Sequence, residues 1–152
     1  MKRTDLSAGS GPILRVALGQ YDTGWHDPQG AIERASEVVR GAARANADLV
    51  VLPEMCTTGF SMEPELYAEP LSGPSVTALG RLASEHCIHV LAGLATREVG
   101  SGETAYFNSA LWFNRAGSIA GEYRKQRLFR LGAESELYTP GSQSVVFDIE
   151  GV

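Results

Sequence analysis

Cysteine is scarce in this chain. Only Cys56 and Cys87 occur among the 152 residues, and they form no Cys-x-x-Cys pair. This pattern suits free thiols in a reducing compartment better than a disulfide framework. The three histidines, His26, His86 and His89, also lack the spacing of metal ligands. The sequence therefore predicts free thiols in a reducing compartment and no metal ion.

Long apolar runs and an excess of positive charge are lacking as well. No run approaches the roughly 18–20 apolar residues that span a bilayer. Residues 1–12 carry two positive charges without the apolar segment of a signal peptide, and they are interpreted as a disordered lead-in. The net charge of -5 argues against nucleic acid or an anionic membrane as a partner. Together these features favour a cytoplasmic location.

A glycine-rich phosphate loop is missing too. Residues 19–24, after the first predicted strand, read Gly-Gln-Tyr-Asp-Thr-Gly, which does not match the dinucleotide-binding spacing. This mismatch weighs against an unrelated doubly wound domain that binds a small ligand at its strand ends. That domain stays open as one alternative.

The apolar periodicity that is present predicts a single α/β domain, and the length allows one domain with a real core. Residues 55–74 contain five glycines and prolines and are expected to form a long loop, while residues 127–141 look polar and irregular. Strands are expected at residues 13–21, 48–52, 88–95, 104–113, 119–126 and 144–149, and helices at residues 28–45 and 75–85.

One carboxylate follows a short apolar run. Residues 48–55 read Asp-Leu-Val-Val-Leu-Pro-Glu-Met, so Glu54 is expected at the carboxyl end of a buried strand, where open α/β sheets bind ligands. Partial burial there raises the pKa of a carboxylate toward the range of a general base. An ordinary exposed glutamate that opens a loop is the other interpretation, and position alone does not decide between the two.

One lysine stands in a later cationic segment. Strand alternation places Tyr123, Lys125 and Arg127 on one face. A lysine on an inward face is costly unless an acid pairs with it, and Glu54 is a candidate partner. Such a pair could polarise a carbonyl oxygen. A solvated edge strand with protective charges is the alternative.

The two motifs together resemble those of the carbon-nitrogen hydrolase (nitrilase) superfamily. In that family a glutamate closes a Leu-Pro-Glu strand, and a lysine lies in a Tyr-x-Lys-x-His-Leu-Phe segment. Residues 52–55 read Leu-Pro-Glu-Met here, and residues 123–129 read Tyr-Arg-Lys-Gln-Arg-Leu-Phe, with Arg127 at the usual histidine position. Residues 52–62 and 128–141 look most like the omega-amidase branch. The resemblance extends from about residue 13 to the last residue.

This resemblance implies site residues and a fold. Glu54 would be the general base, Lys125 the oxyanion stabiliser, and Glu134 the auxiliary glutamate that orients Lys125 and substrate. The fold would be part of a four-layer α-β-β-α sandwich. Residues 13–152 would be the amino-terminal portion of this domain, truncated before the strand that carries the nucleophilic cysteine. We therefore expect one sheet with both helices on a single face.

The implied activity is that of an amidase. It would release ammonia from a small carboxylic or 2-oxo acid amide, without a metal or organic cofactor, as a homodimer when complete. Arg127 or Arg130 would meet the free carboxylate of the substrate. The alternative is a catalytically inactive family fragment that acts as a binding or assembly module.

Neither cysteine of the chain is expected to serve as the nucleophile. Cys56 is near enough to Glu54 in sequence to face its pocket, but nothing in the sequence supplies it with a neighbour that stabilises a thiolate. Cys87 is interpreted as a core or helix-boundary residue. The 152-residue chain alone is therefore expected to be inactive.

Overall fold

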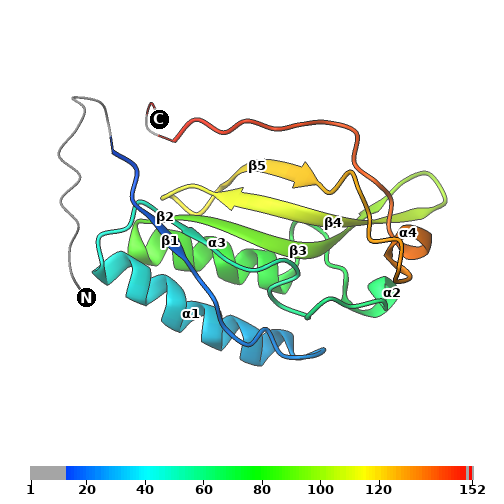
Figure 1. Ribbon diagram of the computed structural model, residues 1–152, viewed down its shortest axis with the longest axis horizontal. Helices are drawn as coiled ribbons and strands as arrows, with labels where there is room; N and C mark the ends of the chain where they lie inside the picture. The colour runs from blue at the N-terminus through cyan, green and yellow to red at the C-terminus, as the bar shows by residue number, and fades with distance from the viewer. Residues whose placement is uncertain (1–12, 150, 152) are drawn as a thin grey trace.

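The structure is a computed structural model that describes residues 13–149 and residue 151. The predicted lead-in at residues 1–12 lies outside the described residues. The described residues form one five-stranded sheet with two long helices and two short ones (Figure 1). The elements are β1 (Val16–Leu18), α1 (Pro28–Arg44), β2 (Leu49–Val51), α2 (Pro64–Tyr67), α3 (Pro74–His86), β3 (His89–Val99), β4 (Thr104–Phe113), β5 (Ile119–Arg124) and α4 (Glu134–Leu137).

Both long helices begin where the sequence predicts. Asp27 caps α1 by accepting a hydrogen bond from the main-chain N–H of Gly30 at 3.0 Å, and Pro28 occupies the first turn. Helix α3 likewise has Pro74 in its first turn, and it is capped after His86 by Cys87, whose φ of 49° is left-handed. The predicted helices at residues 28–45 and 75–85 are confirmed to within one residue.

The sheet is mixed, with strand order β1-β2-β3-β4-β5. The pairs β1–β2 and β2–β3 are parallel, and the pairs β3–β4 and β4–β5 are antiparallel. A helix connects each parallel pair, as parallel strands require a crossover. The first three strands therefore end at the same edge, and residues 114–118 form the predicted hairpin turn between β4 and β5.

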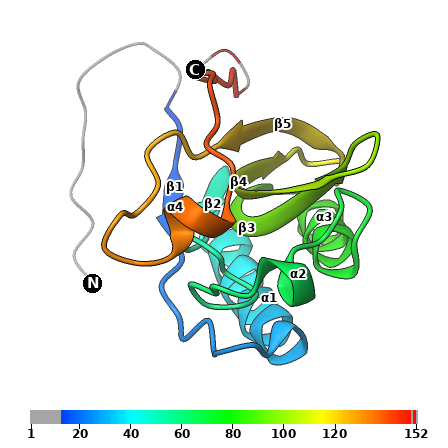
Figure 2. The ribbon, with the colours of Figure 1, turned by 90° about the vertical axis from the view of Figure 1, so that its right-hand side faces the viewer.

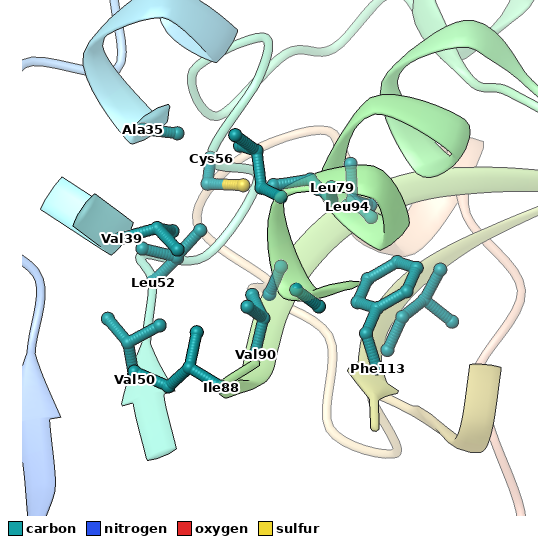
Figure 3. Packing of buried hydrophobic residues seen from close by; sticks show 14 of the residues in the cluster. Ala35, Val39, Val50, Leu52, Cys56, Leu79, Ile88, Val90, Leu94 and Phe113 are labelled. Carbon is teal, nitrogen blue, oxygen red and sulfur yellow. The ribbon is translucent and has the colours of Figure 1, made fainter. Parts of the chain in front are cut away.

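Helices α1 and α3 cover one face of the sheet, here called the covered face, as Figure 1 shows. The main hydrophobic core lies between them and the strands (Figure 3). Leu79 of α3, Leu94 of β3 and Phe113 of β4 are almost completely buried there. The expectation of one sheet with both helices on a single face is confirmed.

The opposite face of the sheet, here called the open face, carries no long helix from residues 13–149 or 151. Val16 and Leu18 of β1 are exposed, the latter by 81%. The end of the described chain runs along this side without joining a ladder (Figure 1). Phe147 packs on Trp112 with ring centroids 5.0 Å apart, and a side chain at Gly121 would collide with the Phe147 ring.

Three local predictions are therefore corrected. The strand predicted at residues 144–149 is wrong, because this segment lies across the sheet through Phe147 and pairs with no strand edge. The loop at residues 55–74 contains α2, and the irregular stretch at residues 127–141 contains α4. None of the described helices is long and apolar enough to cross a membrane.

Candidate active site

Glu54 lies in a tight turn just beyond the carboxyl end of β2. The turn rests on β3, where Gly93 N–H donates to Pro53 O at 3.2 Å and Cys56 N–H donates to Gly93 O at 2.8 Å. A Cβ on Gly93 would stand 2.6 Å from Glu54 Cα, so only glycine permits this approach. The main chain of Glu54 is thereby fixed, while its side chain remains 50% exposed.

Lys125 follows β5 and reaches two carboxylates. Its main-chain N–H donates to Asn108 O at 2.8 Å, which continues the β4–β5 pairing by one residue. Its Nζ donates to Glu54 Oε1 at 2.8 Å and to Glu134 at 3.0 Å (Oε2) and 3.2 Å (Oε1). The predicted convergence of Glu54, Lys125 and Glu134 is confirmed as geometry.

Glu134 is the buried member of this group. It begins α4 and is 0% exposed. Its Oε2 accepts from Lys125 and from the main-chain N–H of Phe129, at 2.5 Å, and its Oε1 accepts from Lys125 and Asn108. Both oxygens are thus occupied by donors, as a buried carboxylate requires.

Asn108 is a site residue that the sequence did not reveal. Its Nδ2 donates to Glu54 Oε1 at 2.6 Å and to Glu134 Oε1 at 2.7 Å. A signal was present, since asparagine is depleted in strands and Asn108 lies among the aromatic and aliphatic residues of β4. The periodicity indicates a strand there, but it does not say that both carboxylates lie opposite this position.

The contacts shift the pKa values of two groups. Burial alone would lower the pKa of Lys125, but hydrogen bonds and charges from Glu54 and Glu134 outweigh it and raise that pKa. Burial would raise the pKa of Glu134, but the hydrogen bonds from Asn108, Phe129 and Lys125 and the ammonium charge of Lys125 together lower it. Lys125 and Glu134 are consequently both charged at neutral pH.

A depression of about 240 Å³ adjoins Glu54 and Lys125. Val51, Leu91, Ala110 and Tyr123 give it a largely apolar lining, and Asn108 stands at its polar side. A mostly apolar hollow with a few convergent polar groups is the usual form of a small-molecule site. The carboxylate and the ammonium can therefore act on a small ligand placed there.

Both cysteines lie away from this depression. Cys56 is completely buried in the core of the covered face, as Figure 3 shows, and burial raises the pKa of its thiol to about 12. Cys56 therefore does not face the pocket of Glu54, although its position in the sequence allowed this. Cys87 is exposed at the end of α3. Its interpretation as a helix-boundary residue is therefore confirmed, and the alternative interpretation as a core residue is wrong.

Arg127 and Arg130 line a different hollow. Both side chains are exposed, and they border a depression of about 460 Å³ whose lining residues are not shared with that of Glu54 and Lys125. Their expected contact with a substrate carboxylate stays a prediction. Among residues 13–149 and 151, no group of three or more His, Cys, Asp or Glu side chains is placed to hold a metal ion.

The loop after Glu54 is fixed to the site through Ser61. Its Oγ lies 2.9 Å from His26 Nε2, and its carbonyl accepts from the Tyr138 hydroxyl at 2.9 Å. The neighbouring Phe60 ring lies 5.1 Å from Lys125 Nζ. Figure 2 shows α4, which precedes Tyr138, beside the strand ends on the same side of the molecule as α2. One loop residue thus connects three segments of the chain.

A match to known proteins accompanies this geometry. The model of the carbon-nitrogen hydrolase family matches residues 15–152. The chain belongs to the carbon-nitrogen hydrolase family. It is 31% identical over 141 residues to the 2-oxoglutaramate amidase of Bacillus subtilis, which covers 90% of this chain and 52% of the relative. An omega-amidase of Xenopus laevis is 30% identical over 126 residues, covering 77% and 44%. The chain spans about half the length of the curated relatives it matches.

Solved structures of carbon-nitrogen hydrolases share the fold. The superfamily protein XC1258 from Xanthomonas campestris, which carries an arsenic adduct in its active site, matches with a TM-score of 0.82 and 32% identity. The match covers 91% of this chain and 50% of that one. An amidase from Nesterenkonia sp. matches with a TM-score of 0.74 and 20% identity, over 86% and 49%, which is a likeness of fold. The predicted nitrilase-type α/β fold is confirmed.

Proposed function

We propose that this chain carries the base and the oxyanion-binding group of an amidase. In the whole protein, Glu54, Lys125 and Glu134 would act with a cysteine that lies outside these 152 residues. The observation that carries the proposal is the ammonium of Lys125 held between Glu54 and Glu134 at 2.8 and 3.0 Å. The substrate class is a small carboxylic or 2-oxo acid amide, in keeping with the relatives named 2-oxoglutaramate amidase and omega-amidase.

The two carboxylates have different roles in this proposal. Oε1 of Glu54 accepts from Lys125 and Asn108, and no donor among the described residues contacts its Oε2. Glu54 is half exposed and can take a proton on that oxygen. Both oxygens of Glu134 are engaged, so Glu134 fixes the ammonium and is unavailable as a base. Glu54 is accordingly the general base and Glu134 the positioning residue.

The reaction follows from these roles. Glu54 takes the thiol proton of the cysteine, and the thiolate attacks the amide carbonyl carbon, forming a C–S bond. The ammonium of Lys125 stabilises the negative charge on the carbonyl oxygen. The C–N bond then breaks, and the protonated Glu54 gives its proton to the leaving NH2 group, which departs as ammonia. Glu54 next takes a proton from water, whose oxygen attacks the thioester carbon. The C–S bond breaks, Glu54 returns the proton to the sulfur, and the carboxylic acid and free thiol are released.

A chimera tests the proposal. Residues 15–152 are joined to the remaining carboxyl-terminal part of the Bacillus subtilis 2-oxoglutaramate amidase, and ammonia release from 2-oxoglutaramate is measured. Folding is checked by a cooperative unfolding transition. We expect turnover in the chimera and none in the 152-residue chain. Glu54→Gln or Lys125→Ala should reduce kcat by about 10²–10⁴-fold, the usual contribution of a positioned acid–base group.

Glu103→Gln is the matched control, because Glu103 is exposed in the turn between β3 and β4. Full activity of a folded Lys125→Ala chimera would contradict the site assignment. A chimera that folds and binds the amide without turning it over would instead favour the inactive binding module. The homodimer, the cytoplasmic location and the fragment nature of the chain are predictions that stand beside this proposal.

A further inference from the structure

Asn108 joins the two carboxylates of the site through a single amide group. Its side chain is buried, with the residue 4% exposed, and its Nδ2 lies 2.6 Å from Glu54 Oε1 and 2.7 Å from Glu134 Oε1. A primary amide has two N–H bonds, so each can serve one carboxylate. The main chain of Asn108 also pairs with that of Lys125. The amide and the ammonium therefore occupy neighbouring positions between the same two acids.

The importance of the Asn108 amide depends on which acceptors the three N–H bonds of the Lys125 ammonium contact. An ammonium has three N–H bonds. One donates to Glu54 at 2.8 Å, and one donates to Glu134 Oε2 at 3.0 Å. The contact of the third, to Glu134 Oε1, is the longest at 3.2 Å, and that oxygen already accepts from Asn108. The third hydrogen can therefore leave Glu134 for a substrate oxygen without leaving a buried acceptor unsatisfied.

The same amide also acts on Glu54. Because Asn108 and Lys125 both donate to Oε1, the carboxylate is held with Oε2 turned away from them. Asn108 offers each carboxylate an N–H without adding a charge that would compete with Lys125.

We infer that Asn108 is a positioning residue of the reaction: it commits one oxygen of Glu54, leaves the other to take a proton, and releases one N–H of Lys125 for the substrate carbonyl. This inference rests on the proposed amidase function. It concerns a residue that acts through Glu54, Glu134 and Lys125 and does not itself touch the reacting atoms.

The test compares two Asn→Asp substitutions in the folded chimera. Asn108→Asp keeps the shape of the side chain and removes both donors. Asn114→Asp is the matched control, because the Oδ1 of Asn114 accepts from Ala116 and Ser118 and an aspartate keeps that acceptor. Asn108→Asp should lower kcat by about 10²-fold with little change in KM, as for a misplaced catalytic group. Asn114→Asp should leave kcat unchanged.

The pH profile separates positioning from packing. An aspartate at position 108 becomes a donor when protonated, so Asn108→Asp should regain part of its activity as the pH falls, unlike the unmodified chimera. A packing role would lower stability without this change of profile. An Asn108→Asp chimera that folds with unchanged kcat and pH profile overturns the inference.

A second variant and a second readout serve if Asn108→Asp does not fold. Asn108→Ser in the 152-residue chain should raise the pKa of Glu134. This pKa is measured from the NMR signal of the Glu134 carboxyl carbon, which is assigned because it disappears in Glu134→Gln. An unmoved Glu134 titration overturns the inference. If Glu54→Gln and Lys125→Ala abolish turnover while the Asn108 variants do not, only the inference fails. If Glu54→Gln is fully active, the proposed function fails with it.

Discussion

The covered face and the open face of the sheet differ in what their side chains do. The same strand supplies both, since Leu111 and Phe113 of β4 enter the core under the helices, while Asn108 and Ala110 line the depression beside Glu54 and Lys125. On the covered face the side chains are apolar and closely packed. On the open face a polar group stands at the edge of an apolar floor. Stability and chemistry are thus divided between the two sides of one β-sheet.

The main chain of the shared strands links the site to the core. Gly93 and Asn108 belong to strands β3 and β4, which also carry buried core residues such as Leu94 and Phe113. The strands fix the main-chain positions of Glu54 and Lys125. The hydrogen-bond donors around the carboxylates fix the positions of the terminal side-chain atoms. Substitutions on the two faces should therefore separate loss of stability from loss of function.

A pair of leucines gives the largest contrast. Leu94 is 1% exposed on the covered face, and Leu18 is 81% exposed on β1. Leu94→Ala should reduce the free energy of unfolding by about 2–5 kcal/mol, because it removes buried methyl groups and leaves a cavity. Leu18→Ala should change it by less than about 0.5 kcal/mol. Urea unfolding of both variants measures the difference, and equal losses would refute the contrast between the faces.

The next largest difference is expected between the unfolding free energies lost when each of the two glutamates of the site is substituted. Glu134→Gln replaces a buried carboxylate with an amide whose NH2 group faces the donors of Lys125, Asn108 and Phe129, and it should cost on the order of 3 kcal/mol. Glu54→Gln changes a half-exposed side chain and should cost less than about 1 kcal/mol. The same unfolding assay applies. A larger loss of unfolding free energy for Glu54→Gln than for Glu134→Gln would contradict the finding that Glu134 is the more buried of the two.

The pH dependence of stability sharpens this comparison. The pKa of Glu134 is lowered from its ordinary 4.5, so its contribution is present above that value and is lost as the pH falls through the lowered pKa. The pKa of Lys125 is raised from 10.5, so its contribution is present below 10.5 and is lost as the pH rises through the raised pKa. The difference in unfolding free energy between the unmodified chain and Glu134→Gln should narrow at both extremes. A constant difference below pH 4.5 would contradict it.

The smallest expected effect concerns the reactivity of the two thiols. Cys56 is completely buried in the core of the covered face with a pKa raised to about 12, whereas Cys87 is exposed. A thiol-specific disulfide reagent reacts with the thiolate and needs access to it. One thiol per chain should react at once, and the second only on unfolding. Cys87→Ser should remove the fast phase. A fast phase that persists in this variant would place Cys56 at the surface.

Much of this architecture was predictable from the sequence. Alternation and helical spacing placed the five strands and both long helices, because each has an apolar face of regular period. Leu52-Pro53-Glu54 and the segment around Lys125 predicted the ion pair, since a carboxylate and an ammonium that are both partly buried need each other. Glu134 came from family resemblance alone.

What could not be predicted depends on tertiary partners. The segment at residues 144–149 has the composition of a strand, but a strand requires an edge to pair with, and Phe147 contacts Trp112 and Gly121 instead. Cys56 follows Glu54 by two residues, yet the turn at Met55, with φ of 45°, sends its side chain to the opposite side of the sheet. Asn108 can be recognised as a site residue only once it is known that two carboxylates distant in the sequence accept hydrogen bonds from it.

The attachment of Ser61 has a consequence for ligand binding. His26 holds its side chain, Tyr138 holds its carbonyl, and Phe60 beside it lies near the ammonium of Lys125. A loop fastened at these points has already lost its conformational freedom when the chain folds, so a ligand need not supply the free energy to order it. These contacts preorganise the loop beside Glu54 and Lys125 before any ligand arrives.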